Sequence, residues 1–495
     1  MSNITNEQSS YRQIMKATSL FGGVQVFQII IQVIRSKFVA VLLGPSGMGI
    51  AGLLMSTIGL IAGLTNFGLG TSAVKNVAEA NETGNVNRIA TVITIIRRLV
   101  WLTGVLGMLV TMILSPWLSQ ITFGNRNYTL AFIWISITLL FNQLTSGQLV
   151  LLQGMRKLQY LAKANLFGSV LGLIITVPLY YKLGLDGIVP GIIITSVISF
   201  LLSFFFSKKI DIVPINVSKM RTIAESKSML TMGFMISLSG LITIGAAYIV
   251  RIFISRQGGI ADVGLYNAGF VIIETYVGMV FTAMGADYFP RLSAVNHDNK
   301  KIRELVNQQS VIALLIIMPI VVFFLIFSPI IIQLLYSKTF LSIEQMISLA
   351  IIGTLFRAVS WSMGFILFAK SDSKLFIMTA LGFNSIFLLN NIVGYILWGL
   401  TGLGVSFMLN YLFHLVVLFF ITKYYYQFSF TKDLIRIFFT SLFFCILGLV
   451  FAFYTHNMFK YLLGILLIIA TLVFSYLELD KRLKIKELIL NYINK

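Results

Sequence analysis

The chain has 495 residues, of which 57% are hydrophobic and only 11% are charged, and its mean hydropathy is +0.91. Because soluble domains carry about 25% charged residues, this composition excludes an ordinary soluble protein and predicts an all-α polytopic membrane protein. The single cysteine excludes an internal disulfide, and the net charge of +20 raises the possibility of nucleic-acid binding, which the charge distribution below argues against.

Apolar runs long enough to cross a bilayer recur along the whole chain. The N-terminal residues 1–11 are polar and lack the layout of a signal peptide, so the first helix is expected to be retained. We predict about 14 transmembrane helices, at residues 17–43, 47–71, 89–114, 129–153, 160–181, 185–206, 230–254, 264–289, 307–335, 343–369, 375–397, 402–426, 434–455 and 460–477. Residues 478–495 have the pattern of an amphipathic cytoplasmic tail on the inner membrane surface.

Lysine and arginine are distributed unequally between the two sides of these predicted helices. Of the 37 basic residues, 28 fall in the N-terminal segment and in every second connection after it, whereas the opposite connections hold five. Basic residues are enriched in cytoplasmic loops, so this distribution predicts that both termini are cytoplasmic. It also assigns the positive charge to the inner leaflet and membrane lipids, so we expect no nucleic acid as a partner.

Several glycine positions recur with an offset of 215 residues. Gly49 matches Gly264, Gly70 matches Gly285, and the segment 184–187 matches 399–402. A shared register at several markers indicates an internal duplication. Because each copy holds six helices, both copies have the same orientation, which predicts two parallel six-helix bundles. Small residues near the repeat axis would let the bundles rock.

This repeat sets the expected domain boundaries. The N-terminal bundle is expected at residues 1–206, a cytoplasmic linker at 207–228 and the C-terminal bundle at 229–426. Two additional C-terminal transmembrane helices at 427–477 and the amphipathic tail at 478–495 lie outside the repeat.

A polar stripe runs along the first predicted helix. Gln25, Gln28, Gln32 and Arg35 are spaced by three, four and three residues, so their side chains share one face. Polar side chains are costly against lipid, so this face meets protein or water. The stripe forms either the wall of a polar cavity or a set of interhelical hydrogen bonds. The charge on Arg35 favours the cavity.

Other charged and polar residues within the spans are candidates for binding or coupling. Arg357 lies near the middle of its helix, where it is either an anion anchor or the partner of Glu274. Arg251 corresponds to Arg35 within one residue after the 215-residue shift. The remaining candidates are Asn142 for substrate binding and Glu274 and Asp287 for coupling transport to an ion.

Enzyme signatures are missing from the sequence. It has no nucleotide-binding glycine loop followed by lysine and serine or threonine, and no cluster of histidine or cysteine with metal-ligand spacing. The predicted outer loops are short and poor in carboxylates, which disfavours a membrane-embedded polymerase or glycosyltransferase. We therefore expect neither catalysis nor a cofactor.

Three motifs resemble those of a known transporter superfamily. The chain has a Gly-Pro-x-Gly-x-Gly turn at 44–49, Ser-Pro at 115–116 and 328–329, and Gly-Leu-x-Gly at 184–187 and 399–402. With the parallel repeat, they make residues 11–426 similar to the multidrug/oligosaccharidyl-lipid/polysaccharide exporter superfamily. Residues 11–80 most resemble its O-antigen flippases of the Wzx type. The resemblance implies a central cavity in the bacterial inner membrane, and it suggests that Arg35, Arg251 and Arg357 hold the diphosphate of an undecaprenyl-diphosphate-linked oligosaccharide.

The alternatives are a lipid II-type flippase, which the two additional helices resemble, and a cation-coupled multidrug exporter of the same superfamily. An exporter of cationic drugs would be expected to have an acidic cavity, whereas cations outnumber carboxylates within these spans. A lipid-linked oligosaccharide flippase also implies a polysaccharide polymerase and a chain-length regulator as partners.

Overall fold

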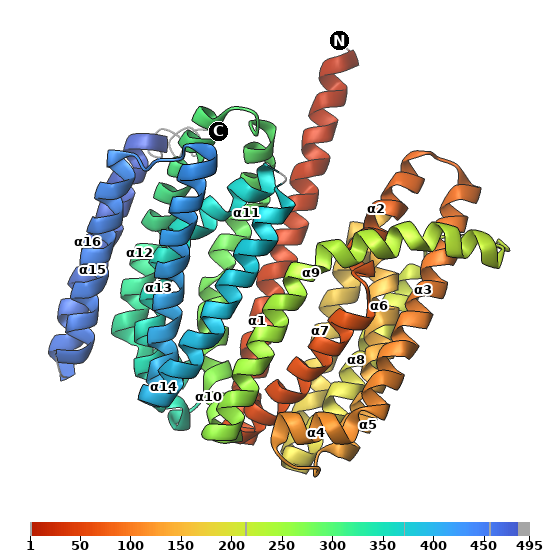
Figure 1. The fold of residues 1–495 in the computed structure, drawn as a ribbon, viewed down its shortest axis with the longest axis horizontal. Coiled ribbons are helices and arrows are strands. Elements are labelled where there is room, and N and C mark those ends of the chain that lie inside the picture. The colour runs from red at the N-terminus through yellow and green to blue at the C-terminus, as the bar shows by residue number, and fades with distance from the viewer. Residues whose placement is uncertain (1, 213–214, 371, 455–456, 484–495) are drawn as a thin grey trace. The chain divides into compact units, whose positions relative to one another are not determined.

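The computed structural model describes residues 2–212, 215–370, 372–454 and 457–483, with most side chains described from Phe27 onward. All regular structure in these ranges is helical (Figure 1). The elements of the first half of the chain are α1 (Ser2–Thr65), α2 (Leu69–Glu82), α3 (Val86–Ile113), α4 (Ser115–Phe123), α5 (Thr129–Ile135), α6 (Ile137–Gly154), α7 (Leu158–Leu183), η1 (Gly184–Gly187), α8 (Ile188–Ser207) and α9 (Lys219–Gln257). They are followed by α10 (Ile260–Phe270), η2 (Val271–Val277), α11 (Met279–Ala294), α12 (Asn299–Leu335), η3 (Lys338–Ile343), α13 (Glu344–Ala369), α14 (Ser373–Tyr426), α15 (Lys432–Tyr454) and α16 (Asn457–Leu483).

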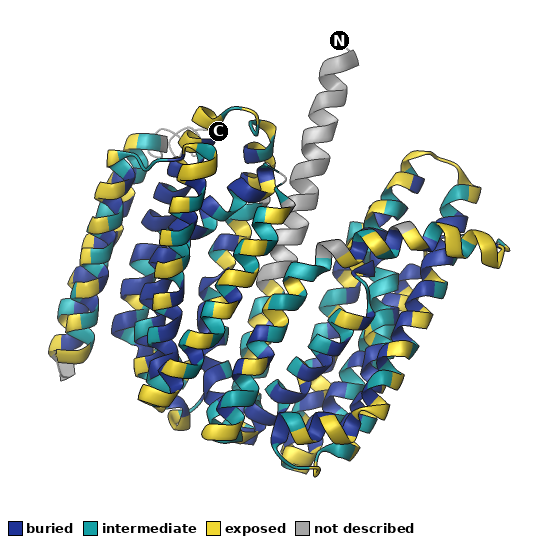
Figure 2. Ribbon diagram, in the orientation of Figure 1, coloured by how far each residue is buried: buried dark blue, intermediate teal, exposed yellow. Residues whose placement is uncertain are grey.

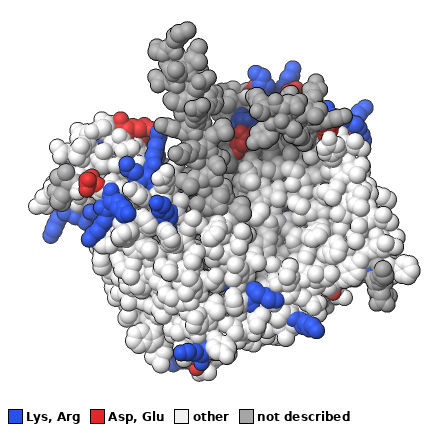
Figure 3. All heavy atoms as spheres, turned by 180° about the vertical axis from the view of Figure 1, so that it is seen from behind, with Lys and Arg blue, Asp and Glu red and all other residues white. Residues whose placement is uncertain are grey.

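The helices have the length and composition of membrane spans. Within the described residues, 11 helical segments are long and apolar enough to cross a membrane. Three of them are of double length and are broken at Gly44, Gly184 and Gly399. When each broken segment is counted as two helices, the segments equal in number the 14 predicted transmembrane helices. The predicted all-α polytopic fold is therefore confirmed. Figure 3 shows charged side chains gathered in the upper and the lower parts of the visible face, with a broad, mostly uncharged surface between them.

Glycine is required at these breaks because the backbone there is left-handed. Gly44, Gly184 and Gly399 have φ values of 63°, 56° and 56°. After Gly44, Pro45 starts the second half of α1, where its missing N–H has no helical partner to lose. Gly184 and Gly399, which are 215 residues apart, also share similar ψ values of −130° and −137°. A duplicated framework predicts this common conformation.

The two Ser-Pro motifs have different structural effects. Ser115 and Pro116 start the short helix α4 after α3 has ended, whereas α12 continues through Ser328 and Pro329 to Leu335. Proline removes one helical hydrogen bond, but one face of the helix on either side of Pro329 is fully packed, with Ile326 and Ile332 completely buried. We infer that packing maintains α12 across a residue that would otherwise end it.

The chain forms two compact units, Met1–Gly264 and Leu265–Lys495. In the first unit, α3 packs against α6, α7 against α8, and α9 against α1 and α2. In the second unit, α12 and α13 form the buried centre, and α15 and α16 pack against α12 (Figure 2). This division assigns α9 to the first unit because of its contacts there. The boundary at 207–228, derived from the repeat, stays a prediction about the duplicated halves.

Part of the predicted linker is helical and attached to α3. α9 begins at Lys219, and its Glu225 forms ion pairs with Arg88 at 2.7 Å and with Arg221 at 3.1 Å. Burial raises the pKa of the Glu225 carboxyl, but hydrogen bonds and charge from the two arginines outweigh this effect and lower the pKa overall. These contacts fix the start of α9 on the surface of the first unit.

Gly49 and Gly264, which are equivalent in the repeat, lie at one close helix crossing within the first unit. A Cβ on Gly49 would lie 1.9 Å from the carbonyl oxygen of Ile260, and a Cβ on Gly264 would lie 1.8 Å from that of Pro45. Ile260 is itself the repeat equivalent of Pro45, so the two copies make reciprocal contacts. Only glycine permits backbones to approach this closely.

We expect Gly49→Ala and Gly264→Ala each to destabilise the protein, because either methyl group would overlap a backbone oxygen. Gly59→Ala in the same helix is the matched control, since no atom lies within 4 Å of its added Cβ. The measurement is the thermal unfolding temperature of the detergent-solubilised protein. The substitutions at the crossing should lower it by several degrees, and Gly59→Ala should leave it unchanged or raise it. Equal effects at all three sites would contradict the close crossing.

Candidate functional site

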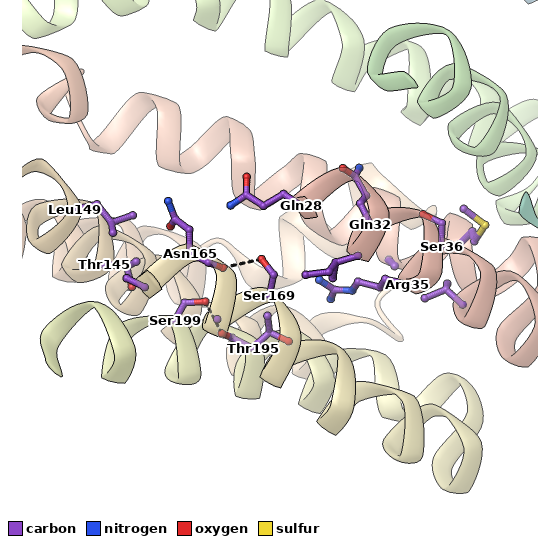
Figure 4. A pocket seen from close by; sticks show the side chains of 16 residues that line it. Gln28, Gln32, Arg35, Ser36, Thr145, Leu149, Asn165, Ser169, Thr195 and Ser199 are labelled. Carbon is purple, nitrogen blue, oxygen red and sulfur yellow. Dashed lines mark hydrogen bonds between the residues drawn. The ribbon is translucent and has the colours of Figure 1, made fainter. Parts of the chain in front are cut away.

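A cavity of about 560 Å³ lies within the first unit, between α1, α6, α7 and α8. This size falls in the range of about 300–1,000 Å³ that is typical of ligand pockets. Figure 4 shows Arg35 extending from α1 towards the polar side chains of α7 and α8. The polar side chains that line the cavity are Gln28, Gln32, Arg35, Ser36, Thr145, Asn165, Ser169, Thr195 and Ser199.

The polar stripe predicted on the first helix contributes three of these groups. The structure places Gln28, Gln32 and Arg35 together on the cavity wall. Gln25 belongs to the same predicted face, but it lies outside the residues whose side chains are described. Of the two interpretations of the stripe, the position of these side chains supports the cavity wall.

Arg35 makes the cavity electropositive. No aspartate or glutamate is among its lining residues, and within the described part of the chain the Arg35 side chain has no hydrogen bond or ion pair. A cation in a membrane-spanning helix costs at least about 2.5 kcal/mol at the bilayer centre on insertion scales. A wet cavity reduces that cost and leaves the planar guanidinium free for a bidentate anion such as phosphate.

The uncharged polar groups provide hydrogen bonds around this cation. The hydroxyls of Ser169 and Ser199 donate to carbonyl oxygens one turn earlier, both at 2.9 Å, which leaves their oxygen lone pairs as acceptors. Among the described residues, the side-chain amides of Gln28, Gln32 and Asn165 have no protein partner and can both donate and accept. Such a lining suits a ligand with many hydroxyl groups next to an anionic group.

The residues that α6, α7 and α8 contribute to the cavity were not predicted from the sequence. Asn165 and Ser169 are spaced by four on α7, and Thr195 and Ser199 have the same spacing on α8. This is the periodicity that revealed the stripe on the first helix. The same criterion, applied to pairs of polar residues rather than to a stripe of four, would have indicated the pairs on α7 and α8. Only the fold shows that both pairs face one cavity.

In the second unit, Arg357 on α13 contacts Glu274 on η2. Their ion pair has an N–O distance of 2.7 Å, with the Arg357 side chain 16% exposed and the Glu274 side chain 41% exposed. The guanidinium carbon also lies 5.0 Å from the ring centre of Phe281 and 5.3 Å from that of Tyr411. The structure therefore contains the ion pair that was the alternative to an anion anchor.

A local change of helix type positions Glu274. Residues Val271–Val277 form a π-helix between two α-helices, a distortion that is often associated with functional sites. A Cβ at the following Gly278 would lie 1.9 Å from the carbonyl oxygen of Glu274. Glycine is therefore needed where the wide turn ends, and hydrophobic periodicity does not reveal such a turn.

Buried amides and a histidine lie on the other segments of this unit. Asn390 donates to Asn410 at 2.6 Å, and both belong to α14. In the described structure, Asn410 Nδ2 and His414 Nδ1 are buried without a hydrogen-bond partner. The ring of His414 packs 4.5 Å from Phe383 and 6.2 Å from Tyr411, which also stacks on Arg357. Tyr411 therefore links the ion pair of Arg357 and Glu274 to the buried polar groups of α14.

None of the remaining predicted site residues lines the cavity around Arg35. Arg251 on α9 donates to the carbonyl of Ala247 at 3.0 Å, and Asn142 on α6 is exposed but does not line the cavity. Asp287 on α11 is 76% exposed and pairs with Arg291 at 3.0 Å. The roles of these residues in binding or coupling stay predictions.

Comparisons with known proteins identify related sequences. The family model described as polysaccharide biosynthesis protein matches residues 38–345. The chain is 24% identical over 333 residues to a Shigella flexneri protein named as an O-antigen transporter, covering 65% of this chain and 77% of that one. It is 20% identical over 343 residues to the lipid III flippase of Escherichia coli strain K12, covering 69% and 82%.

Solved structures share the fold at low sequence identity. The lipid II flippase MurJ in an inward closed conformation has a TM-score of 0.67 and 14% identity, covering 95% of this chain and 99% of that one. An inward-facing multidrug resistance MATE family transporter has a TM-score of 0.70 and 15% identity, covering 83% and 96%. These similarities are evidence for the fold alone.

The contribution of the ion pair between Arg357 and Glu274 can be measured by a double-mutant cycle. We expect Arg357→Ala to lower the thermal unfolding temperature more than Glu274→Gln does, because it also removes the contacts of the guanidinium with Phe281 and Tyr411, whereas a glutamine can still accept a hydrogen bond from Arg357. The coupling energy between the two substitutions should be about 0.5–3 kcal/mol. The exposed pair of Asp287 and Arg291 is the control, with coupling near zero. Additive effects of Arg357→Ala and Glu274→Gln would contradict an energetically significant pair.

Proposed function

The chain belongs to the polysaccharide biosynthesis family of Wzx-like flippases in the multidrug/oligosaccharidyl-lipid/polysaccharide exporter superfamily, and we propose that it flips an undecaprenyl-diphosphate-linked oligosaccharide. The family consists of multi-pass membrane transporters rather than enzymes. The proposed direction is from the inner to the outer leaflet of the cytoplasmic membrane, by alternating access. The excess of basic residues in alternate loops supports cytoplasmic termini and thus this orientation.

The observation that carries this proposal is the electropositive cavity around Arg35. A diphosphate with attached sugars cannot cross about 30 Å of hydrocarbon unaided, because its charges and hydroxyls would lose their hydration. Arg35 would bind the diphosphate, and the amides of Gln28, Gln32 and Asn165 would bind sugar hydroxyls. The serine and threonine oxygens of α7 and α8 add acceptors on the opposite wall.

Further residues are included in the proposal because of the helices on which they lie and their expected depth in the membrane. Gln25 extends the stripe of Arg35, while Arg251, Arg357 and Asn142 are proposed to meet the substrate in other states of the cycle. Glu274 is the favoured coupling residue, since protonation or cation binding would compete with its ion pair to Arg357. Asp287 is the weaker candidate because it is exposed and paired with its neighbour Arg291.

Two alternatives predict different substrates. A lipid II-type flippase would carry a muropeptide, and α15 and α16 supply two helices beyond the repeat as that interpretation requires. A multidrug exporter for cationic compounds is disfavoured by the cavity around Arg35, whose lining residues include no carboxylate.

Neighbouring genes for sugar-nucleotide synthesis and glycosyltransferases would favour an oligosaccharide as the substrate. A polysaccharide polymerase and a chain-length regulator would then be the expected protein partners.

We expect Arg35→Ala to reduce display of surface polysaccharide at least about tenfold at unchanged protein level, because the diphosphate loses a charge-assisted bidentate partner of about 1.5–3 kcal/mol. Arg35→Lys should retain part of the activity, since it keeps the charge without the planar fork. Arg126→Ala, in an exposed loop outside the cavity, is the matched control. The assay is complementation of a strain that lacks its own flippase. Separate experiments measure O-antigen display, muropeptide transport and drug resistance, one for each proposed substrate class. Undiminished display with Arg35→Ala would overturn the proposed site.

The coupling role of Glu274 predicts a change in dependence on an ion gradient. In proteoliposomes loaded with lipid-linked oligosaccharide, Glu274→Gln should abolish stimulation by an imposed proton or sodium gradient while gradient-independent exchange remains. Asp287→Asn should keep the stimulation. If Asp287→Asn instead removes it and Glu274→Gln does not, the coupling assignment is wrong.

A further inference from the structure

A second pocket of the first unit lies outside the cavity around Arg35. It has a volume of about 520 Å³ and is formed by α3, α6, α8 and the residues that follow α8. None of its lining residues is shared with the substrate cavity. The six side chains that matter here are Arg97 and Trp101 of α3, Phe200 and Phe204 of α8, and Lys208 and Asp211 beyond α8. We refer to it as the α3–α8 pocket.

The charged groups of this pocket lack salt-bridge partners in the part of the chain that the structure describes. Within the described ranges, neither Arg97, Lys208 nor Asp211 forms an ion pair, and the Arg97 guanidinium makes no hydrogen bond. The neighbouring Arg98 differs, because it donates to the carbonyl of Val217 at 2.8 Å and to Thr222 at 2.7 Å. Arg98 therefore has a structural role, whereas Arg97 is available to a ligand.

The pocket has a charged end and an aromatic interior. Trp101 lies one helical turn from Arg97 on α3, and Phe204 and Phe200 lie one and two turns from Lys208 along α8. The Lys208 ammonium rests 4.6 Å above the Phe204 ring. Trp101 is 53% exposed and Phe204 is 38% exposed. A cationic rim above accessible aromatic side chains matches a phosphate headgroup above acyl chains.

The position of the rim agrees with the surface of a membrane. The candidate span that includes α8 ends at Ser207, so Lys208 stands at the boundary of the apolar segment. On the orientation proposed above, this is the inner leaflet, where basic residues attract anionic lipids. Two cations and one carboxylate leave the rim with a net charge of +1, which matches the single negative charge of a phosphodiester.

We propose that the α3–α8 pocket binds the phosphodiester headgroup of an anionic glycerophospholipid of the inner leaflet. Arg97 and Lys208 bind the phosphate oxygens, and Trp101, Phe200 and Phe204 contact the upper acyl chains. The bound lipid replaces the missing partners of the two cations and joins α3 to α8. The site is independent of the substrate cavity, although its assignment to the inner leaflet rests on the proposed orientation.

The test uses the purified full-length protein titrated with phosphatidylglycerol, with bound lipid counted by native mass spectrometry and thermal stability measured in parallel. Arg97→Gln and Lys208→Gln should each weaken binding about fivefold, which corresponds to about 1 kcal/mol for one basic residue at an anionic surface. Lys209→Gln is the matched control, since its ammonium lies over Tyr160, Phe205 and Phe206 and it does not line the pocket.

Two further variants test the proposal even if Arg97→Gln or Lys208→Gln fails to fold. Asp211→Asn should tighten binding of phosphatidylglycerol, because it removes the one carboxylate of the rim. Arg35→Ala should leave this binding unchanged while impairing transport, which separates the lipid site from the proposed function. The proposal is overturned if Arg97→Gln and Lys209→Gln bind equally. It is also overturned if undecaprenyl diphosphate displaces the lipid from the wild type but not from Arg97→Gln, since the pocket would then bind substrate.

Discussion

The structure depends on one constraint, which is that a polar group within a bilayer must find its partner inside the protein. Backbone groups meet this constraint by forming helices throughout the described residues. Hydroxyl side chains meet it by donating to a carbonyl one turn earlier, as Thr103 does at 2.9 Å and Thr176 at 2.7 Å. Because these solutions satisfy most polar groups locally, a charged group without a partner that also lines a pocket is a candidate for contact with a ligand.

Arginines within or at the ends of the membrane helices show three outcomes of this constraint. Arg357 is neutralised by Glu274 in the second unit, and Arg98 is bound by the backbone and hydroxyl of the segment around the start of α9. Arg35 and Arg97 have no such partner among the described residues, and each lines a pocket. The difference between an arginine paired within the protein and one proposed to bind a ligand is therefore a matter of neighbours rather than of residue type.

The duplicated framework and the polar side chains follow different rules. Glycines equivalent in the repeat adopt the same left-handed conformation at Gly184 and Gly399, and Gly49 and Gly264 meet at a reciprocal crossing. The ion pair of Glu274 has no counterpart at the equivalent Gly59, and Gln28 and Gln32 correspond to Thr243 and Ala247, although Arg251 lies within one residue of the position equivalent to Arg35. Duplication thus preserves backbone geometry, which depends on small residues at a few positions, while the polar side chains between them differ, as the proposed transport of an asymmetric, anionic substrate requires.

The sequence by itself determined the helical class, the number of membrane segments and the polar face of α1, because each depends on local composition or on a period of 3.6 residues. It also indicated the breaks at Gly44, Gly184 and Gly399, since only glycine accepts that backbone conformation. Only the tertiary structure decided that Asn165 and Thr195 face Arg35, that Glu274 pairs with Arg357 and that α12 passes through Pro329. These features depend on which helices become neighbours, and the packing of distant segments leaves no period in the sequence.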